Sequence, residues 1–295
     1  MTIEHICFDV DDTLYPPSKD FKDAKDKQHT KRLVELLAEK NSKDTIELVE
    51  RLLKEKGFNI SFTELTVESY KYLVKTYGEG GNANLYKKLG VDHTWVERDV
   101  FYTDRSKLID WSHSPAIIEA LKGLKKKGIN LSIFSNTSYG SVALNLKLSG
   151  FTPEIQEELF SVGCMLPLAE ENIGETSVTL EQKLKAGKLT QLDFEYLSLQ
   201  YDAKADFLRR KINVLSSEDS SDYKKPGTGG YERIKRCVAM PPERIMYVGD
   251  SPEKDIAPAK KAGLKSCYVL WGGKVKLHNA DYVIDKLTEI ADVIK

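Results

Sequence analysis

Five stretches of the chain contain a short apolar run with the length of a buried strand. They lie at residues 3–10, 128–140, 244–255, 265–273 and 280–285, and the first three end in polar or acidic side chains. Helical patterns lie between them, such as SPAIIEALKGLKKKG, in which Ser114 and Pro115 suit a helix start and Gly128 suits its end. Strands that alternate with helices predict an α/β fold with a doubly wound parallel sheet.

Two long segments interrupt this alternation. Residues 16–112 carry helical patterns such as TIELVERLLKEKG and TELTVESYKYLVKTYG, each ended by a glycine, and predict an all-helical domain inserted after the first strand. Residues 167–222 are polar and charged and include the amphipathic stretch KLTQLDFEYLSLQYDAKADFLRRKINVL. Because a structureless loop of that length is uncommon, we expect a second, helical insertion there. The core domain is then predicted to comprise residues 1–15 and 113–295.

Composition and charge narrow the class of protein. Lys plus Arg number 44 against 45 Asp plus Glu, mixed along the chain, which argues against a nucleic-acid polymer as partner. No apolar run approaches the ~18 residues of a membrane span, and the chain enters its first strand without a signal-peptide pattern. The four cysteines lack metal-ligand spacing and are expected to be reduced thiols. We therefore predict a cytoplasmic protein that binds neither nucleic acid nor membrane.

The first apolar run leads directly into three acids in the stretch ICFDVDDTLYPPS. Along an extended strand end, Asp9 and Asp11 are expected to point the same way while Val10 enters the core. Two carboxylates on one side need a cation or a shared proton, and Mg²⁺ prefers such oxygen ligands. For Asp12 the simpler interpretation, turn and N-cap chemistry, is retained.

A second acidic strand end, VGDSPEKD, supplies Asp250 and Asp255. In open α/β sheets, ligands bind beyond the carboxyl ends of the strands, so these acids are expected near Asp9 as a carboxylate cage for one Mg²⁺. Taken alone, the stretch is equally compatible with an ordinary loop and helix N-cap.

Two further stretches offer groups suited to a phosphate. In IFSNT, the hydroxyl of Ser135 and the amide of Asn136 can hydrogen-bond phosphate oxygens. In YKKPGTGGYE, Lys225 precedes a proline and a glycine-rich run; most such lysines are simply solvated, and the order is the reverse of a Walker A loop.

The four motifs DVDDT, SN, KP and GDSPEKD, in this order, resemble the haloacid dehalogenase (HAD) superfamily of phosphotransferases with an aspartate nucleophile. The resemblance implies a Rossmann-like core with a mobile helical cap. FDVDDTLYPPS, TYG and DWSHSPAIIEALKGLKKKGINLSIFSN are further similar to the pyrimidine 5'-nucleotidase group, which hydrolyses nucleoside monophosphates.

The resemblance implies a hydrolase with Mg²⁺ as cofactor and an aspartyl-phosphate intermediate. Asp9 would be the nucleophile and Asp11 the general acid and base. The metal would bind Asp9, the backbone carbonyl of Asp11 and the side chain of Asp250. The phosphate would be held by Ser135, Asn136 and Lys225, with Thr13 and Asp255 in support.

The substrate and assembly state remain open at this stage. A small phosphorylated metabolite is expected, with a pyrimidine nucleoside 5'-monophosphate as the leading candidate and phosphoglycolate or a sugar phosphate as alternatives. The same chemistry also serves a mutase, and a non-catalytic regulatory or binding protein on this fold is a further alternative. A hydrolytic dehalogenase would need neither Asp11 nor Asp250. Residues 167–222 could provide a homodimer interface, a lid edge or a solvated elaboration. Specificity residues are expected in the cap, where Tyr70, Tyr77 and Trp95 are predicted to belong to its core.

Overall fold

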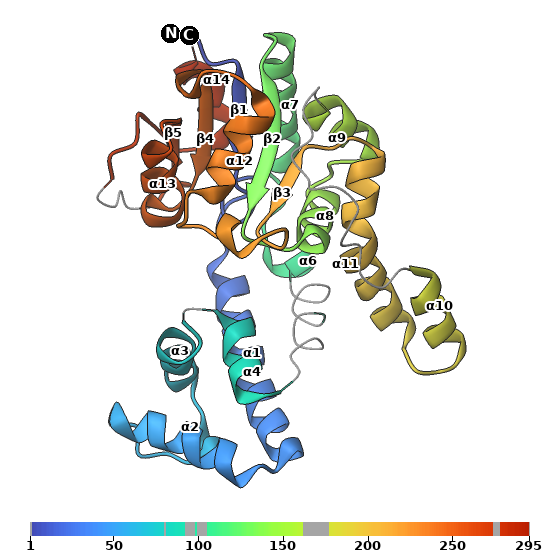
Figure 1. Cartoon of the computed structure of the whole chain (residues 1–295), viewed down its shortest axis with the longest axis vertical. Coiled ribbons are helices and arrows are strands. Elements are labelled where there is room, and N and C mark those ends of the chain that lie inside the picture. Colours follow the sequence, from blue (N-terminus) through green and yellow to red (C-terminus); the bar gives the residue numbers. More distant parts are fainter. Residues whose placement is uncertain are drawn as a thin grey trace. The chain divides into compact units, whose positions relative to one another are not determined.

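The computed structural model describes residues 2–79, 81–91, 98, 105–161, 177–273 and 278–294. It divides into two compact units (Figure 1). The first unit comprises Met1–Pro17 and Asp110–Lys295, and the second comprises Ser18–Ile109. The second unit is thus an insertion in the first.

A six-stranded parallel sheet forms the centre of the first unit, with the order β3-β2-β1-β4-β5-β6. The five predicted strands are confirmed, and β3 is an additional one. The strands are β1 (His5–Phe8), β2 (Asn130–Ser135), β3 (Val214–Ser216), β4 (Ile245–Gly249), β5 (Lys265–Val269) and β6 (Tyr282–Ile284).

Strand β1 lies in the middle of the sheet and is completely buried. His5 is paired in register with Asn130 of β2 on one side and with Ile245 of β4 on the other. The chain builds β2 and β3 on the first side and then returns to build β4, β5 and β6 on the second. The order therefore reverses at β1, where doubly wound sheets form a crevice beyond their carboxyl ends.

Helices cover both faces of the sheet, which confirms the predicted doubly wound α/β fold (Figure 1). On one face, Tyr231 of α12 packs with Phe134 of β2 and Tyr247 of β4 in a buried cluster. The α-helices are α7 (Ser114–Lys126), α8 (Tyr139–Leu148), α9 (Pro153–Phe160), α10 (Ser177–Lys185), α11 (Gln191–Arg209), α12 (Gly229–Val238), α13 (Ala257–Lys261) and α14 (Ile290–Val293). Four shorter helices are η4 (Ser221–Tyr223), η5 (Pro242–Arg244), the π-helix η6 (Pro252–Ile256) and η7 (Leu287–Glu289).

The described part of the predicted helical insertion at 167–222 contains the two helices α10 and α11, but also a strand. Helix α11 ends at Arg209, and Lys211 adopts a left-handed φ of 57° that turns the chain. Val214–Ser216 then pairs with β2 and is buried. The sequence did not predict this strand. Three residues are too few to show a strand period of their own beside an amphipathic helix.

All secondary-structure elements described in the second unit are helices. Side chains of Ser18, Ser42 and Thr66 accept backbone N–H bonds at the starts of α1, α2 and α3, which satisfies donors left open at a helix end. Its core includes Tyr70, with Tyr77 packed against it, as predicted; Trp95 lies outside the described residues. The helices are α1 (Lys19–Lys40), α2 (Lys43–Glu55), η1 (Phe62–Glu64), α3 (Val67–Thr76), α4 (Asn82–Leu89) and α6 (Arg105–Leu108).

None of the helices in the described ranges is long and apolar enough to cross a membrane. Cys7, Cys237 and Cys267 are free thiols, while Cys164 lies outside the described residues.

Candidate active site

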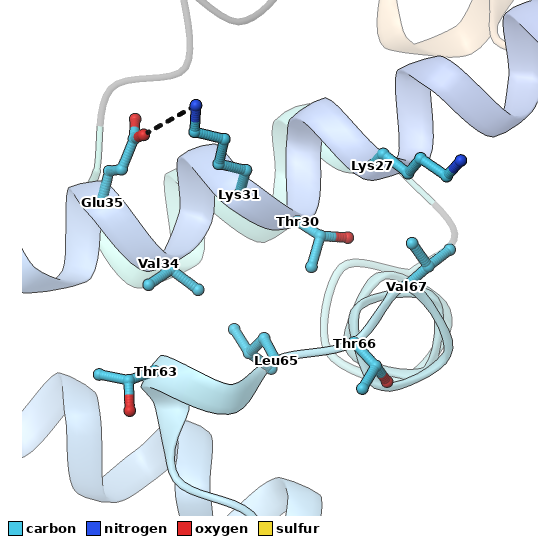
Figure 2. Close-up of a pocket in the computed structure, with 9 residues that line it drawn as sticks. All are labelled: Lys27, Thr30, Lys31, Val34, Glu35, Thr63, Leu65, Thr66 and Val67. Carbon is cyan, nitrogen blue, oxygen red and sulfur yellow. Dashed lines mark ion pairs between the residues drawn. The ribbon is translucent and has the colours of Figure 1, made fainter.

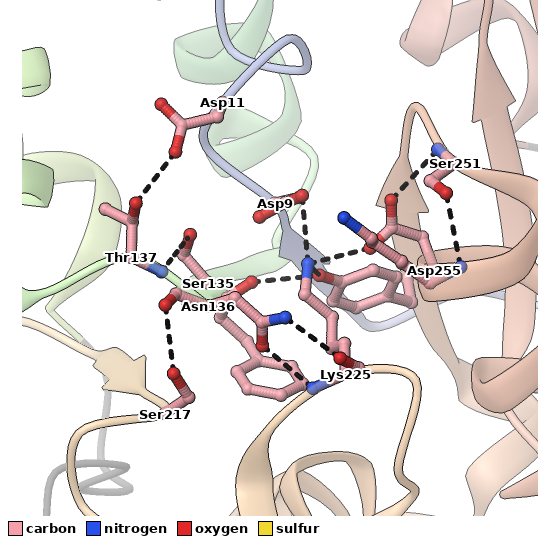
Figure 3. Close-up of polar contacts among 12 residues, drawn as sticks. Asp9, Asp11, Ser135, Asn136, Thr137, Ser217, Lys225, Ser251 and Asp255 are labelled. Atoms are coloured by element: carbon pink, nitrogen blue, oxygen red, sulfur yellow. Dashed lines mark hydrogen bonds and ion pairs between the residues drawn. The ribbon is translucent and has the colours of Figure 1, made fainter. Parts of the chain in front are cut away.

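A pocket of about 290 Å³ lies in the first unit, where residues following β1, β2 and β4 meet the segment before α12. It brings together seven of the eight candidate site residues predicted from the sequence, all except Thr13, from positions as far apart as Asp9 and Asp255. Figure 3 shows the seven except Asp250. The lining residues are Asp9, Asp11, Asp12, Ser135, Asn136, Thr137, Lys225, Asp250, Ser251, Lys254 and Asp255.

The ammonium group of Lys225 lies between two carboxylates. Its Nζ is 2.9 Å from Oδ2 of Asp9 and 2.7 Å from Oδ1 of Asp255, and it donates to the hydroxyl of Tyr247 over 3.0 Å. An ammonium has three N–H donors, so these acceptors use all of them. Lys225 can therefore contact a phosphoryl oxygen only by exchanging one of these three bonds.

Asn136 holds the backbone of Lys225 in place. Its side-chain Oδ1 accepts the Lys225 N–H over 2.8 Å, and its Nδ2 donates to the Lys225 carbonyl over 3.0 Å. The side chain of Asn136 thus has a positioning role, while its contact with a phosphate stays a prediction. Ser135, at the end of β2, is buried, and its Oγ accepts the Thr137 N–H over 3.2 Å.

Asp255 is fixed against the backbone of Gly249. Its Oδ2 accepts the Ser251 N–H over 3.0 Å while its Oδ1 faces Lys225. A Cβ at Gly249 would lie 2.5 Å from both Cβ and Cγ of Asp255, so only glycine leaves room for this carboxylate. Asp255 is therefore a buried counter-charge that orients Lys225.

Burial is the main influence on the pKa values of Asp9 and Asp250. Burial raises the pKa of Asp9 to about 7, although Lys225 opposes the shift. Burial, reinforced by the charges of Asp255, Asp12 and Asp9, raises the pKa of Asp250 to about 8. Burial alone would lower the pKa of Lys225, but Asp255 and Asp9 outweigh it and the net shift is upward, so this lysine remains charged.

The donor set suits a hard divalent cation. Asp9, Asp250 and Asp255 each offer an oxygen within 4.8 Å of the others. Because both oxygens of Asp255 already accept hydrogen bonds, Asp9 and Asp250 are the side chains best able to ligate an ion. Oxygen donors with excess negative charge fit Mg²⁺, which also retains several waters.

Asp11 lines the same pocket but does not point the same way as Asp9. The chain turns directly after Val10, whose carbonyl accepts N–H bonds from Thr13 over 3.2 Å and Leu14 over 3.0 Å. Strand alternation, on which the expectation rested, therefore ends before Asp11. Figure 3 shows the Asp11 carboxylate turned toward Thr137, away from Asp9.

Three side-chain partners of Asp11 were not identified from the sequence. Tyr15 donates from its hydroxyl, Thr137 donates over 2.9 Å and Asn145 donates over 3.0 Å. No local signal links Asn145 to a residue 134 positions away. Thr13 is buried with its hydroxyl unpaired within the described structure, so its predicted supporting role gains no contact here.

A second depression, of about 480 Å³, lies in the helical unit between α1 and the segment from η1 to α3 (Figure 2). Its one ion pair, between Lys31 and Glu35 at 3.9 Å, is solvent-exposed, and its lining lacks a cluster of acids. The cluster of acids around a buried lysine lies in the first pocket. The lining residues here are Lys27, Thr30, Lys31, Val34, Glu35, Thr63, Leu65, Thr66 and Val67.

The sequence was compared with models of known protein families. The model described as haloacid dehalogenase-like hydrolase matches residues 3–167, and a related HAD-hydrolase-like model matches residues 223–290. The chain belongs to the haloacid dehalogenase-like hydrolase family. This confirms the superfamily resemblance, whereas the pyrimidine 5'-nucleotidase subgroup stays a prediction.

Individual relatives are more distant. Glyceraldehyde 3-phosphate phosphatase from Methanocaldococcus jannaschii is 30% identical over 86 residues, which cover 28% of this chain and 37% of that protein. A HAD-hydrolase structure from Bacillus subtilis, described as bound to magnesium, is 16% identical with a TM-score of 0.46, covering 99% of each chain. A HAD phosphatase structure from Thermococcus onnurineus is 16% identical with a TM-score of 0.45, covering 99% of this chain and 97% of that one.

Proposed function

We propose that this hydrolase is a Mg²⁺-dependent phosphomonoesterase that forms an aspartyl-phosphate on Asp9. The observation that carries the proposal is the buried Asp9–Lys225–Asp255 array, which shares one pocket with Asp250, Ser135 and a second acid, Asp11. A nucleophile, a cation-binding acid pair and a proton-transfer group are the components that phosphoryl transfer requires.

In the first step, an oxygen of Asp9 forms a bond to phosphorus while the bond from phosphorus to the leaving oxygen breaks. Asp11 gives its proton to that oxygen, and an alcohol leaves. In the second step, a water oxygen forms a bond to phosphorus, the bond to Asp9 breaks, and Asp11 accepts the water proton. Phosphate is released and both aspartates return to their starting states.

The other residues of the pocket support these steps electrostatically. Lys225 favours the ionised, nucleophilic form of Asp9, against the burial that raises its pKa. If Asp9 turns toward phosphorus, one N–H of Lys225 becomes available to a phosphoryl oxygen, beside the hydroxyl of Ser135. Bound Mg²⁺, held by the carboxylates of Asp9 and Asp250 and the carbonyl of Asp11, would reduce repulsion between nucleophile and phosphate.

A pyrimidine nucleoside 5'-monophosphate is the leading substrate, because the sequence resembles the nucleotidase group along the first strand and the segment leading to β2. A small sugar phosphate is the second candidate, favoured by the 86-residue match to a glyceraldehyde 3-phosphate phosphatase. We assign recognition of the leaving group to the helical unit, Ser18–Ile109, as the cap domain.

The test measures phosphate release from UMP, CMP, AMP, phosphoglycolate and sugar phosphates, with Mg²⁺ or EDTA, for the wild type and Asp9→Asn. Release that requires both Mg²⁺ and Asp9 supports the chemistry, and preference for UMP and CMP supports the nucleotidase assignment. Preference for sugar phosphates supports the second candidate. Equal release by Asp9→Asn would refute the assigned nucleophile, and no release from any substrate would favour the non-catalytic alternative.

A further inference from the structure

The carboxylate of Asp11 accepts hydrogen bonds from three side chains. Its Oδ1 accepts hydrogen bonds from the Tyr15 hydroxyl and from Nδ2 of Asn145, and its Oδ2 accepts one from the Thr137 hydroxyl. These donors come from the turn after β1, from α8 and from the loop after β2. Three separate parts of the first unit therefore converge on one carboxylate.

Two of the three donors, Tyr15 and Asn145, are buried. Asn145 is 1% exposed and Tyr15 is 3% exposed. Asn145 also donates to the Tyr15 hydroxyl over 3.3 Å, and the ring of Trp111 lies 5.0 Å from that of Tyr15. A buried side chain in close packing has few alternative rotamers, so Tyr15 and Asn145 fix the direction of the Asp11 carboxylate rather than follow it.

The hydrogen bonds of Lys225 are directed to other groups. Its three donors face Asp9, Asp255 and Tyr247, so the cation that serves the nucleophile is separate from the groups that hold Asp11. The pocket thus has two independently supported carboxylates, one held by charge and the other by neutral hydrogen-bond donors.

We propose that Tyr15, Thr137 and Asn145 are positioning residues that orient Asp11 for proton transfer to the leaving group. This inference rests on the proposed function, because it takes Asp11 as the general acid. Proton transfer needs the donor within hydrogen-bond reach of the leaving oxygen, and a carboxylate free to rotate spends little time there. The three residues touch Asp11 and act through it.

The proposal makes the contribution of these residues depend on the leaving group. An alkyl alkoxide must be protonated as it leaves, whereas p-nitrophenolate leaves without a proton. General acid catalysis contributes about 10²- to 10⁴-fold, so loss of its orientation should cost about tenfold or more with an alkyl phosphate. The same change should alter p-nitrophenyl phosphate cleavage less than about threefold, because that cleavage bypasses the proton transfer.

The experiment compares kcat/KM for one alkyl phosphomonoester and for p-nitrophenyl phosphate in Tyr15→Phe and Asn145→Ala. The ratio kcat/KM reports the first step, so slow breakdown of the intermediate does not obscure it. Tyr15→Phe keeps the ring against Trp111 and remains decisive if Asn145→Ala fails to fold. Gln156→Ala is the matched control, because Gln156, like Asn145, has a buried side-chain amide. That amide donates to the backbone carbonyl of Phe151, and Gln156 does not line the pocket.

Selective loss with the alkyl substrate, and no further loss when Asn145→Ala is added to Asp11→Asn, is the expected result. Equal loss with both substrates, or an additional loss in the Asp11→Asn background, would overturn the positioning role. Activity of Asp9→Asn distinguishes failure of the proposed function from failure of the positioning role. If it retains activity, the proposed function fails; if it is inactive while Tyr15→Phe and Asn145→Ala behave like the wild type, only the positioning role fails.

Discussion

Gly249→Ala should disable the site although it removes no charged side chain. The added Cβ would lie 2.5 Å from Cβ and Cγ of Asp255, and ordinary contact begins at 3.4 Å, so the carboxylate must move by about 0.9 Å. Asp255 holds Lys225 at 2.7 Å, and that lysine in turn holds Asp9. A displacement of about 1 Å at a catalytic centre can cost about 100-fold in rate, and overpacking a buried site costs about 1–3 kcal/mol of stability.

The assay measures kcat with the phosphomonoester that the wild type hydrolyses best, together with the free energy of unfolding from urea titration. Gly123→Ala is the control, because a Cβ at this position in α7 would meet nothing within 4 Å. It should keep full activity and gain up to about 1 kcal/mol, as expected for Gly→Ala within a helix. If Gly249→Ala keeps kcat within about threefold of the wild type, the close approach to Asp255 does not determine the geometry of Lys225.

Three further predictions concern charge. Burial, with a smaller effect of the positive charge of Lys125, lowers the pKa of His5 from 6.5 to about 4, so the unfolded chain binds the proton first as pH falls. The free energy of unfolding should therefore drop by up to about 3.5 kcal/mol (2.5 pH units at about 1.4 kcal/mol each) between pH 6.5 and 4. Urea titrations of His5→Gln should lack this loss. The pKa values of Asp9 and Asp250 are raised to about 7 and 8, so Mg²⁺ must displace protons from these carboxyl groups when it binds. The Kd for Mg²⁺, measured by calorimetry, should therefore decrease as pH rises from 6 to 8. A pH-independent Kd would contradict this ligand set. Lys225→Met should abolish turnover and lower the free energy of unfolding by about 3–5 kcal/mol near pH 8, because Asp9 and Asp255 lose their buried counter-charge. An unfolding midpoint equal to that of the wild type would refute this electrostatic role.

The sequence predicted what depends on local pattern. An apolar run marks each of the strands β1, β2, β4, β5 and β6. Such a run also leads to Asp9, Ser135 and Asp250, each at the carboxyl end of a strand. Because the strands are parallel, these three residues lie at the same edge of the sheet. β3 was missed because its three residues follow directly on an amphipathic helix.

Other features depend on tertiary contacts that no local pattern encodes. The phosphate contact of Asn136 stays a prediction, and the pairing of its side chain with the backbone of Lys225, 89 positions away, was not predicted. Asp11 was expected to follow strand alternation, but the turn after Val10 redirects it toward Thr137 and Asn145. In each case the sequence pointed to a residue that lines the pocket, and the partner of its side chain depends on the fold.

The central place of β1 affects the order in which the protein can form during synthesis. His5 pairs with Asn130, 125 positions later, and with Ile245, 240 positions later. At roughly 5–20 residues per second, the ribosome needs on the order of 10–50 seconds to deliver the second partner strand. The helical unit, whose contacts are nearer in sequence, can fold within that interval, while β1 emerges early with an unpaired edge. Asp9 therefore meets Lys225 and Asp255 only late in translation, so a nascent chain lacks the assembled pocket until most of the protein has been made.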